Sequence, residues 1–435
     1  MPVAPETPAP PAPTPTISPE QTPTPPADQA PAAETPAPPA AETPTPPADE
    51  GPTPMAPEVP TPSPAEAAVQ PAEGTPKPTL PVDDPLATRV GFFAPLTGVH
   101  ASLGTDAMNG ATLALEEINL AGGALDHPLK LIIKDTESLP EKTGGVVNDL
   151  INTDKVAALI GEIATDRSLI AAALAQPAGI PMITPSATNE KVTTTGDHIF
   201  RVCFTDAFQA AVMAKFARSL EVEKAAILFD ASSASSTAQM EAFKADVLQH
   251  EGTILAEEFY RVGDTDFAYQ LNAIRDKIPD IIFLPGYFTE AAPIIRQARQ
   301  LGIDAPFLGT DGWEATEFLK MAGPAANNCY FATHFSNEQS SEKVRAFSDA
   351  YYARFGTAPS SVAALTYDSL WLLAEALKHA GRADPAAIRN AISEIRDFPG
   401  VTGIISFDKG ADPKKPAIVI RVQDGKFSYL ETMEL

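Results

Sequence analysis

The sequence has 435 residues and a formal net charge of −25, from 56 acidic and 31 basic side chains. Such a charge excludes proteins that hold nucleic acid or an anionic membrane through basic patches, because both partners would be repelled. Two cysteines are too few for a disulfide scaffold. The sequence contains no apolar run near the roughly 20 residues that cross a bilayer.

Residues 1–85 differ in composition from the rest of the chain. They hold 29 of the 45 prolines, together with mostly Ala, Thr and Glu, and they contain no aromatic residue. Such a segment cannot bury enough apolar surface to offset its chain entropy. We therefore predict a disordered, Pro-rich arm with polyproline II character.

Beyond residue 85, short apolar runs alternate with amphipathic stretches. Runs that are apolar almost throughout predict strands of parallel sheets covered on both faces, and the alternation predicts right-handed βαβ units. Because one open sheet of this many units would be unusually large, two α/β lobes are expected. The predicted strands include 90–94, 129–133, 156–160, 225–229, 280–284 and 417–422, and the predicted helices are 105–120, 141–152, 168–176, 207–220, 235–251, 267–277, 289–301, 341–355, 362–380 and 385–394.

Small polar residues follow several of the predicted strands. Thr165 comes shortly after the run 156–160, and Ser186 and Thr188 follow Pro181-Met-Ile. Ligands of open α/β sheets bind at the carboxyl ends of the strands, and hydroxyls and free N–H groups at helix N-termini suit a carboxylate. The alternative for each residue is ordinary helix capping.

The second half places an aromatic residue and a carboxylate after strands. Tyr287 follows the run 280–284, and Asp311 follows Phe307-Leu-Gly. A carboxylate at a strand end can pair with a ligand ammonium. The alternative for Asp311 is an Asx turn before Gly312.

The ordered set of motifs resembles the type I periplasmic binding proteins, in the leucine/isoleucine/valine-binding branch of ABC transporter substrate-binding proteins. The resemblance covers roughly residues 87–430. Its motifs are Gly91-Phe-Phe-Ala-Pro-Leu-Thr-Gly98, Leu103-Gly104, Asn109-Gly-Ala111, Glu117-Ile-Asn119, Gly122-Gly123, Ile180-Pro-Met-Ile-Thr-Pro-Ser-Ala-Thr-Asn189, Phe200-Arg201, Asp264-Thr-Asp266-Phe267 and Arg296-Gln-Ala-Arg299-Gln-Leu-Gly302.

The resemblance implies an α/β fold of two doubly wound Rossmann-like lobes joined by a three-strand hinge. The first lobe would comprise 86–204 and 334–415, and the second 205–333 and 416–435. It implies capture of a small polar ligand, an amino acid or a related amide or carboxylate, in the cleft between the lobes. The ligand would be delivered to an ABC transporter permease, with no cofactor, metal or nucleic acid involved.

The resemblance also implies individual roles. Thr165 would offer its hydroxyl to the ligand carboxylate, and Ser186 would contribute backbone contacts. Thr188 would hold the carboxylate with its amide and reach the ammonium with its hydroxyl. Asp311 would supply the counter-charge for the ammonium, and Tyr287 would close over the ligand from the second lobe.

Two positions depart from the family pattern. Ala234 stands where the family commonly has a tyrosine lid, and Leu103 stands where some members carry tryptophan. Both changes are expected to enlarge or reshape the pocket for the ligand side chain. The sequence therefore leaves open which amino acid binds, and whether the ligand is an α-amino acid at all.

Two other functions compete with ligand capture. An enzyme is disfavoured, because the GxGxxG, GxxxxGK[ST] and GxSxG patterns are absent and the six histidines have no metal-like spacing. A ligand sensor or a cell-envelope lipoprotein on the same fold is the main alternative, because the arm suits a tethered protein. We expect an extracytoplasmic location, although Met1-Pro-Val-Ala-Pro shows neither the basic start nor the apolar run of a signal peptide.

Two buried free thiols are the favoured interpretation of Cys203 and Cys329, and a single bridge between them is the alternative. Cys203 lies near the predicted first crossing between the lobes, whereas Cys329 begins a strand of the second lobe. We therefore expect the two cysteines to lie too far apart to bridge.

If the arm is disordered, limited proteolysis should trim the chain to near residue 85 and leave a core with an unchanged melting temperature. Calorimetry before and after trimming measures this. A core that melts at a lower temperature after trimming would mean that the arm packs against it.

Overall fold

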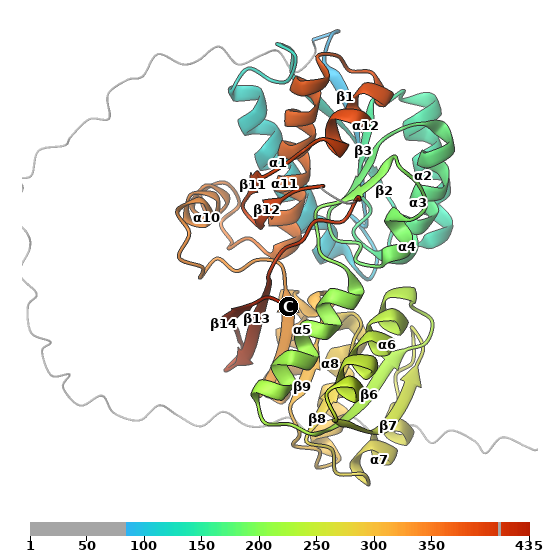
Figure 1. Cartoon of the computed structure of the whole chain (residues 1–435), viewed down its shortest axis with the longest axis vertical. Coiled ribbons are helices and arrows are strands. Elements are labelled where there is room, and N and C mark those ends of the chain that lie inside the picture. The colour runs from blue at the N-terminus through green and yellow to red at the C-terminus, as the bar shows by residue number, and fades with distance from the viewer. Residues whose placement is uncertain (1–83, 408–409) are drawn as a thin grey trace, which may run out of the picture. The chain divides into compact units, whose positions relative to one another are not determined.

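The computed structural model describes residues 84–407 and 410–435. The predicted arm, apart from its last two residues, lies outside the described residues. The remainder forms two α/β lobes, each built on one sheet (Figure 1). Within the described ranges, no helix combines the length and the apolar character needed to span a membrane.

The first lobe is built on a five-stranded parallel sheet with strand order β2-β1-β3-β4-β5. The short strands β3, β4 and β5 are buried along their whole length, as expected for a parallel sheet covered on both faces. The strands are β1 (Thr88–Ala94), β2 (Leu129–Asp135), β3 (Ala158–Ile160), β4 (Met182–Thr184) and β5 (Ile199–Arg201).

The second lobe repeats this topology and adds two strands. Its parallel part runs β7-β6-β8-β9-β10, and β13 and β14 extend it in antiparallel fashion. The strands are β6 (Lys224–Asp230), β7 (Thr253–Tyr260), β8 (Ile281–Phe283), β9 (Phe307–Gly309), β10 (Cys329–Thr333), β13 (Ala417–Gln423) and β14 (Lys426–Met433), with a separate hairpin of β11 (Phe398–Gly400) and β12 (Gly403–Ile405).

Helices cover both faces of each sheet. In the first lobe, α1 and α11 lie side by side on one face, and α2 and α3 pack together on the other (Figure 1). The first-lobe helices are α1 (Ala101–Leu120), α2 (Pro140–Asn148), α3 (Thr165–Ala178), α4 (Glu190–Thr193), α10 (Glu342–Phe355), α11 (Ser361–Ala380) and α12 (Pro385–Ser393). The second-lobe helices are α5 (Asp206–Ser219), α6 (Ala234–Gln249), α7 (Ala268–Arg275), α8 (Phe288–Gln300) and α9 (Thr316–Ala322).

The close contact of α1 with α11 depends on Gly110. A Cβ atom at this position would lie 2.1 Å from the carbonyl oxygen of Ala363 on α11. Any larger residue would push the two helices apart, and α11 carries Val362 at its start. The spacing of these helices therefore also fixes where Val362 lies.

The chain passes between the lobes three times. It leaves the first lobe after β5, returns after β10 and crosses again before β13. The Lys415 ammonium donates to the Val202 carbonyl oxygen at 3.0 Å, which ties the third passage to the first. The predicted α/β fold with a three-strand hinge is confirmed, whereas the exact residue boundaries of the lobes stay a prediction.

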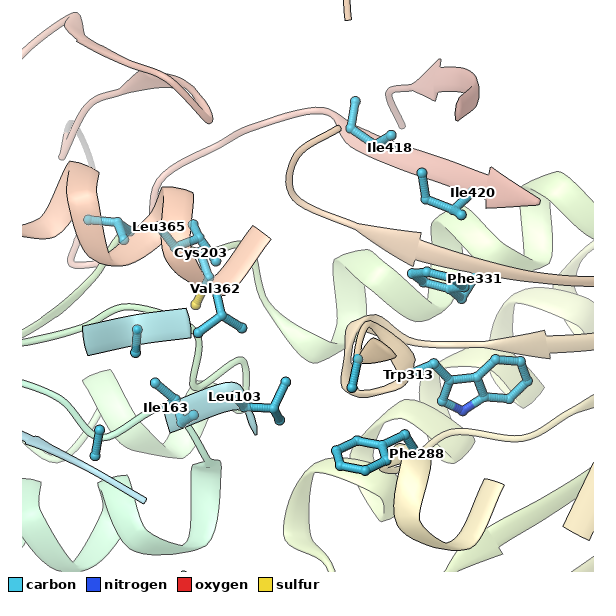
Figure 2. Packing of buried hydrophobic residues seen from close by; sticks show 14 of the residues in the cluster. Leu103, Ile163, Cys203, Phe288, Trp313, Phe331, Val362, Leu365, Ile418 and Ile420 are labelled. Carbon is cyan, nitrogen blue, oxygen red and sulfur yellow. The ribbon is translucent and has the colours of Figure 1, made fainter. Parts of the chain in front are cut away.

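The apolar core continues from one lobe into the other. Figure 2 shows Leu103, Ile163 and Val362 together in the first lobe, and Trp313 and Phe288 in the second. All five side chains belong to one cluster of buried residues. Both cysteines are buried free thiols, Cys203 beside the first passage and Cys329 in β10, as the sequence predicted.

The predicted helices correspond to observed ones, with ends that differ by a few residues. Two strands at the margins of the second sheet, β7 and β14, were not predicted. Both alternate exposed and partly buried residues, and their charged side chains interrupt the apolar run that identified the central strands.

Arg201, at the end of β5, fixes the segment that follows β4. Its guanidinium is fully buried and donates to the carbonyl oxygens of Ala187 at 2.6 Å and Asn189 at 2.7 Å. It also bonds to the Asp412 carboxylate at 2.6 Å, just before the third passage. One side chain therefore holds both the 187–189 segment and a hinge strand.

Replacing Arg201 with methionine should lower the free energy of unfolding by about 3–5 kcal/mol, because several buried acceptors lose their donor. Urea unfolding followed by circular dichroism measures this change. The control is Arg354→Met, which breaks the exposed pair with Glu116 at 3.0 Å and should cost no more than about 1 kcal/mol. Equal losses in the two variants would contradict the structural role of Arg201.

Candidate functional site

A cavity lies where the carboxyl ends of the two sheets face each other. Each sheet has the strand order 2-1-3-4-5 in its parallel part, so each has a switch point beside its first strand where a ligand can enter. The cavity encloses about 40 Å³, room for a few water molecules when one needs about 10–15 Å³. It is lined by Leu103, Ile163, Thr165, Ser186, Thr188, Ser233, Ser235, Ser236, Gln239, Gly286, Tyr287, Thr310, Asp311, Gly312 and Val362.

The structure brings all six predicted site residues to this cavity. The first lobe contributes Leu103 from α1, Thr165 from the first position of α3, and Ser186 and Thr188 from the segment after β4. Thr165, Ser186 and Thr188 are buried. Ser186 donates its hydroxyl to the Ile163 carbonyl oxygen at 2.9 Å, so the serine hydroxyl is already engaged within the protein.

The second lobe contributes Tyr287, which precedes α8, and Asp311, which begins the 3₁₀ turn η2 (Asp311–Trp313) after β9. Ala234 does not line the cavity, whereas its neighbours Ser233 and Ser235 do. The missing tyrosine lid is therefore replaced by a serine-lined wall. The cavity is small, although Leu103 stands where some family members carry the larger tryptophan.

The two lobes meet directly through hydroxyl and amide groups beside the cavity. The Thr188 hydroxyl of the first lobe lies 3.3 Å from the Ser235 hydroxyl of the second. The Asn189 side-chain amide donates to the Ala234 carbonyl oxygen at 3.2 Å. The lobes are therefore closed around the cavity.

Asp206 is a buried acid at this boundary. Its carboxylate accepts from Asn189 at 2.9 Å, Ser235 at 2.6 Å and Gln239 at 2.8 Å. Burial raises the pKa of Asp206 to about 7, although the hydroxyls of Ser235 and Thr188 act in the opposite direction. This carboxylate links both lobes but does not line the cavity.

Asp311 contacts two polar side chains beside the cavity. Its carboxylate accepts from the Gln209 side-chain amide at 3.0 Å and contacts the His334 ring nitrogen Nε2 at 3.2 Å. Burial lowers the pKa of His334, against the opposing effect of Asp311, and this favours the neutral ring. In the described ranges no Lys or Arg pairs with Asp311.

Three residues that shape this end of the cavity were not predicted. Gln209 and Gln239 lie inside α5 and α6, so they do not follow a strand and the sequence pattern does not indicate them. The Gln239 side-chain amide donates a hydrogen bond to the Gln209 side-chain oxygen at 3.0 Å. His334 directly follows β10, so the search for polar residues after strands would have found it. The ring stacks on Phe204 with a centroid distance of 3.6 Å.

The arrangement suits reversible binding of a small zwitterion. Hydroxyls of Thr165 and Thr188 lie on the first-lobe side, and the negative charge of Asp311 lies on the second-lobe side. Leu103 and Val362 supply an apolar wall. Among the residues with described positions, no three His, Cys, Asp or Glu side chains gather in a way that would hold a metal ion.

Known proteins share this architecture and sequence. Residues 87–426 match the model of a family described as periplasmic binding protein. The chain belongs to the periplasmic binding protein family. Members of this family bind solutes, so this chain is a solute-binding protein and not an enzyme.

Named relatives come from several bacteria. A "Leu/Ile/Val-binding protein homolog 1" of Brucella suis is 30% identical, over 79% of this chain and 93% of its own length. A "Leucine-, isoleucine-, valine-, threonine-, and alanine-binding protein" of Pseudomonas aeruginosa is 30% identical, over 75% and 87%. A branched-chain amino acid transporter substrate-binding protein of Streptococcus pneumoniae, solved with isoleucine, is 35% identical with a TM-score of 0.76, covering 80% and 99%.

The neutral state of His334 is open to direct measurement. The His334 ring should take up its proton only below the pH range of a free histidine, because burial opposes its charge. Imidazole NMR shifts followed from pH 8 to 5, with the signal assigned through His334→Gln, measure this. Titration at or above the ordinary histidine range would mean that a charged His334 already neutralises Asp311.

Proposed function

We propose that this protein captures a small α-amino acid between its lobes and delivers it to the permease of an ABC transporter. The observation that carries the proposal is the carboxylate of Asp311, which lines the cavity and which no Lys or Arg of the described residues pairs with. Asp311 is partly buried, and a charge withdrawn from water is stabilised by an opposite charge nearby. The ammonium group of an amino acid supplies it.

The carboxylate of the same ligand would lie toward Thr165 and Thr188. Thr165 begins α3, where free backbone N–H groups and the positive end of the helix dipole favour an anion. Ser186 would contribute backbone contacts, and Tyr287 would cover the ligand from the second lobe. These roles agree with the family resemblance.

The ligand side chain would contact an aliphatic wall of Leu103, Ile163 and Val362. An aliphatic wall favours an apolar ligand side chain over a charged one. The relatives named for leucine, isoleucine, valine, threonine and alanine bind ligands of this class. We therefore propose a small aliphatic or hydroxylated amino acid.

Binding would be coupled to closure of the lobes. The ligand would be held first by one lobe and covered by the other as the hinge closes. Closure changes the surface that the two lobes present together, and the permease would read ligand occupancy from that surface. We place the protein outside the cytoplasm, where periplasmic binding proteins meet their transporters.

A thermal-shift panel tests the ligand class. Alanine, threonine, valine, leucine and isoleucine should raise the melting temperature, since a ligand that binds only the folded state stabilises it. Benzoate, which has a carboxylate but no ammonium, is the matched negative control. Stabilisation by benzoate and by none of the amino acids would contradict the proposal.

Asp311→Asn should weaken binding of the best amino acid from this panel by roughly 30-fold or more, since an unpaired buried charge costs about 2–5 kcal/mol. Thr165→Val should cost less, near 1–2 kcal/mol, because backbone donors remain. Isothermal titration calorimetry measures both losses.

The control for the Asp311 variant is Asp264→Asn. The Asp264 carboxylate accepts from the Arg261 amide at 2.9 Å in an exposed turn, so this variant should bind like the wild type. Unchanged affinity in Asp311→Asn would assign Asp311 to a purely structural turn and point to a ligand without positive charge.

A further inference from the structure

Glu314 connects the two lobes immediately behind the cavity. It follows η2, three residues after Asp311, and accepts a hydrogen bond from the Thr333 hydroxyl in its own lobe. Its other carboxylate oxygen accepts from the backbone N–H of Ser361 at 2.9 Å. Ser361 is the first residue of α11, which packs on α1 in the first lobe.

This contact completes the cap of α11 from the opposite lobe. The first N–H groups of a helix have no partner within the helix, and a carboxyl oxygen can accept a hydrogen bond from one of them. The side chain of Ser360 accepts from Ala363 at 3.3 Å, as an ordinary N-cap does. Ser360 does not accept from the Ser361 N–H, which donates to Glu314 instead. This hydrogen bond can therefore form only while the two lobes are closed.

The position of this contact makes it relevant to the ligand. Glu314 is in the same loop as Asp311, and Ser361 is followed by Val362, which lines the cavity. The contact therefore holds Asp311, the proposed ammonium site of the second lobe, close to Val362 in the apolar wall of the first lobe. Glu314 does not itself line the cavity.

We propose that Glu314 is a positioning residue that fastens the closed form by capping α11 across the cleft, so that it sets ligand affinity without touching the ligand. The proposal rests on the proposed function, because it assumes capture by closure. It goes beyond that function by assigning part of the affinity to a contact between the lobes.

The surroundings of Glu314 make the stability of the closed form depend on pH. Burial raises the pKa of Glu314 to about 7, although hydrogen bonds from Thr333 and Ser361 oppose the shift. Burial also raises the pKa of Asp106 on α1 to about 6, against a hydrogen bond with Ser360. Glu314 belongs to the second lobe and Asp106 to the first, and each carboxyl group adds a negative charge at this boundary when it is ionised.

The other charged groups packed around this pair do not neutralise it. Glu317 of α9 adds negative charge near Asp106 and is itself paired with Lys320 at 3.5 Å. Tyr351 of α10 faces Asp106 as an uncharged phenol. No Lys or Arg in the described part of the chain pairs with Glu314 or Asp106.

The sign of the effect follows from the raised pKa. A carboxyl group whose pKa is higher in the closed form makes that form bind more protons than the open form does. Proton uptake therefore accompanies closure, and closure weakens as the pH rises through about 7. Ligand affinity should be up to about tenfold higher at pH 6 than at pH 8.

The experiment compares wild type with Glu314→Ala and Glu314→Gln. Glu314→Ala removes the cap and should weaken amino-acid binding by roughly tenfold, as expected for a lost helix cap, mainly through faster dissociation. Glu314→Gln keeps an acceptor without a charge, so the ratio of its affinities at pH 6 and pH 8 should be smaller than that of the wild type by up to about tenfold. Calorimetry and stopped-flow dissociation measure these effects, and Glu314→Gln carries the test if Glu314→Ala does not fold.

Asp384→Ala is the matched control. Asp384 caps α12 within the first lobe by accepting from Ala387 at 3.0 Å. Asp384→Ala removes a helix-capping hydrogen bond of the same kind, but this bond lies within the first lobe and does not connect the two lobes. This variant should bind with wild-type affinity and wild-type pH dependence.

Hydrogen exchange at the Ser361 amide provides a readout that needs no ligand. It should speed up in Glu314→Ala, whereas exchange at Ala387 should not. Wild-type dissociation rate and pH dependence in both Glu314 variants would overturn the proposal. A pH dependence that persists in Glu314→Gln and disappears in Asp206→Asn would assign the proton to Asp206 and also overturn this role.

These results separate the two proposals. If no amino acid binds wild type, the proposed function fails, and the exchange rate at Ser361 still shows whether Glu314 holds the lobes together. If amino acids bind but the Glu314 variants behave like wild type, the proposed function stands and the positioning role fails.

Discussion

The parallel strands of both sheets end at the boundary between the lobes, and the site follows from this constraint. A parallel strand must be followed by a loop that returns along a helix, so the loops after the strands gather at one edge of the sheet. Each lobe presents that edge to the other. The cavity is therefore lined by strand-end residues such as Thr188, Tyr287 and Asp311.

The chemistry at this boundary is that of carboxylates held by neutral donors. Asp206 and Asp311 accept from amides, hydroxyls or a neutral imidazole, and Glu314 accepts from a hydroxyl and a backbone N–H. A buried negative charge that no cation neutralises can be relieved by a cationic ligand group or by a proton. We assign the first solution to Asp311 and the second to Glu314.

Rigidity at the boundary comes from the first lobe. The Arg201 guanidinium fixes the carbonyl groups of Ala187 and Asn189, and the same side chain reaches Asp412 beside the third passage. The segment that carries Thr188 is therefore held by contacts within the first lobe that do not involve the second lobe. Such preorganisation lowers the entropy that binding must otherwise overcome.

The sequence predicted the features that repeat along the chain. Apolar runs marked the central strands, because side chains buried on both faces of a sheet must be apolar at nearly every position. Polar residues directly after those runs marked Thr165, Thr188 and Asp311. The marginal strands β7 and β14 escaped prediction, because one face of each is partly exposed and accepts charged residues.

By itself the sequence determined the α/β class, the two lobes and five of the residues that meet at the cavity, since these depend on local periodicity and on position relative to a strand, whereas Leu103 was indicated by the family resemblance. The tertiary structure decided what surrounds them. Gln209 approaches Asp311 from within a helix, and Glu314 reaches Ser361 across the cleft, about fifty residues further along the chain. Contacts between segments so far apart leave no local pattern, because they exist only once both lobes are folded and closed.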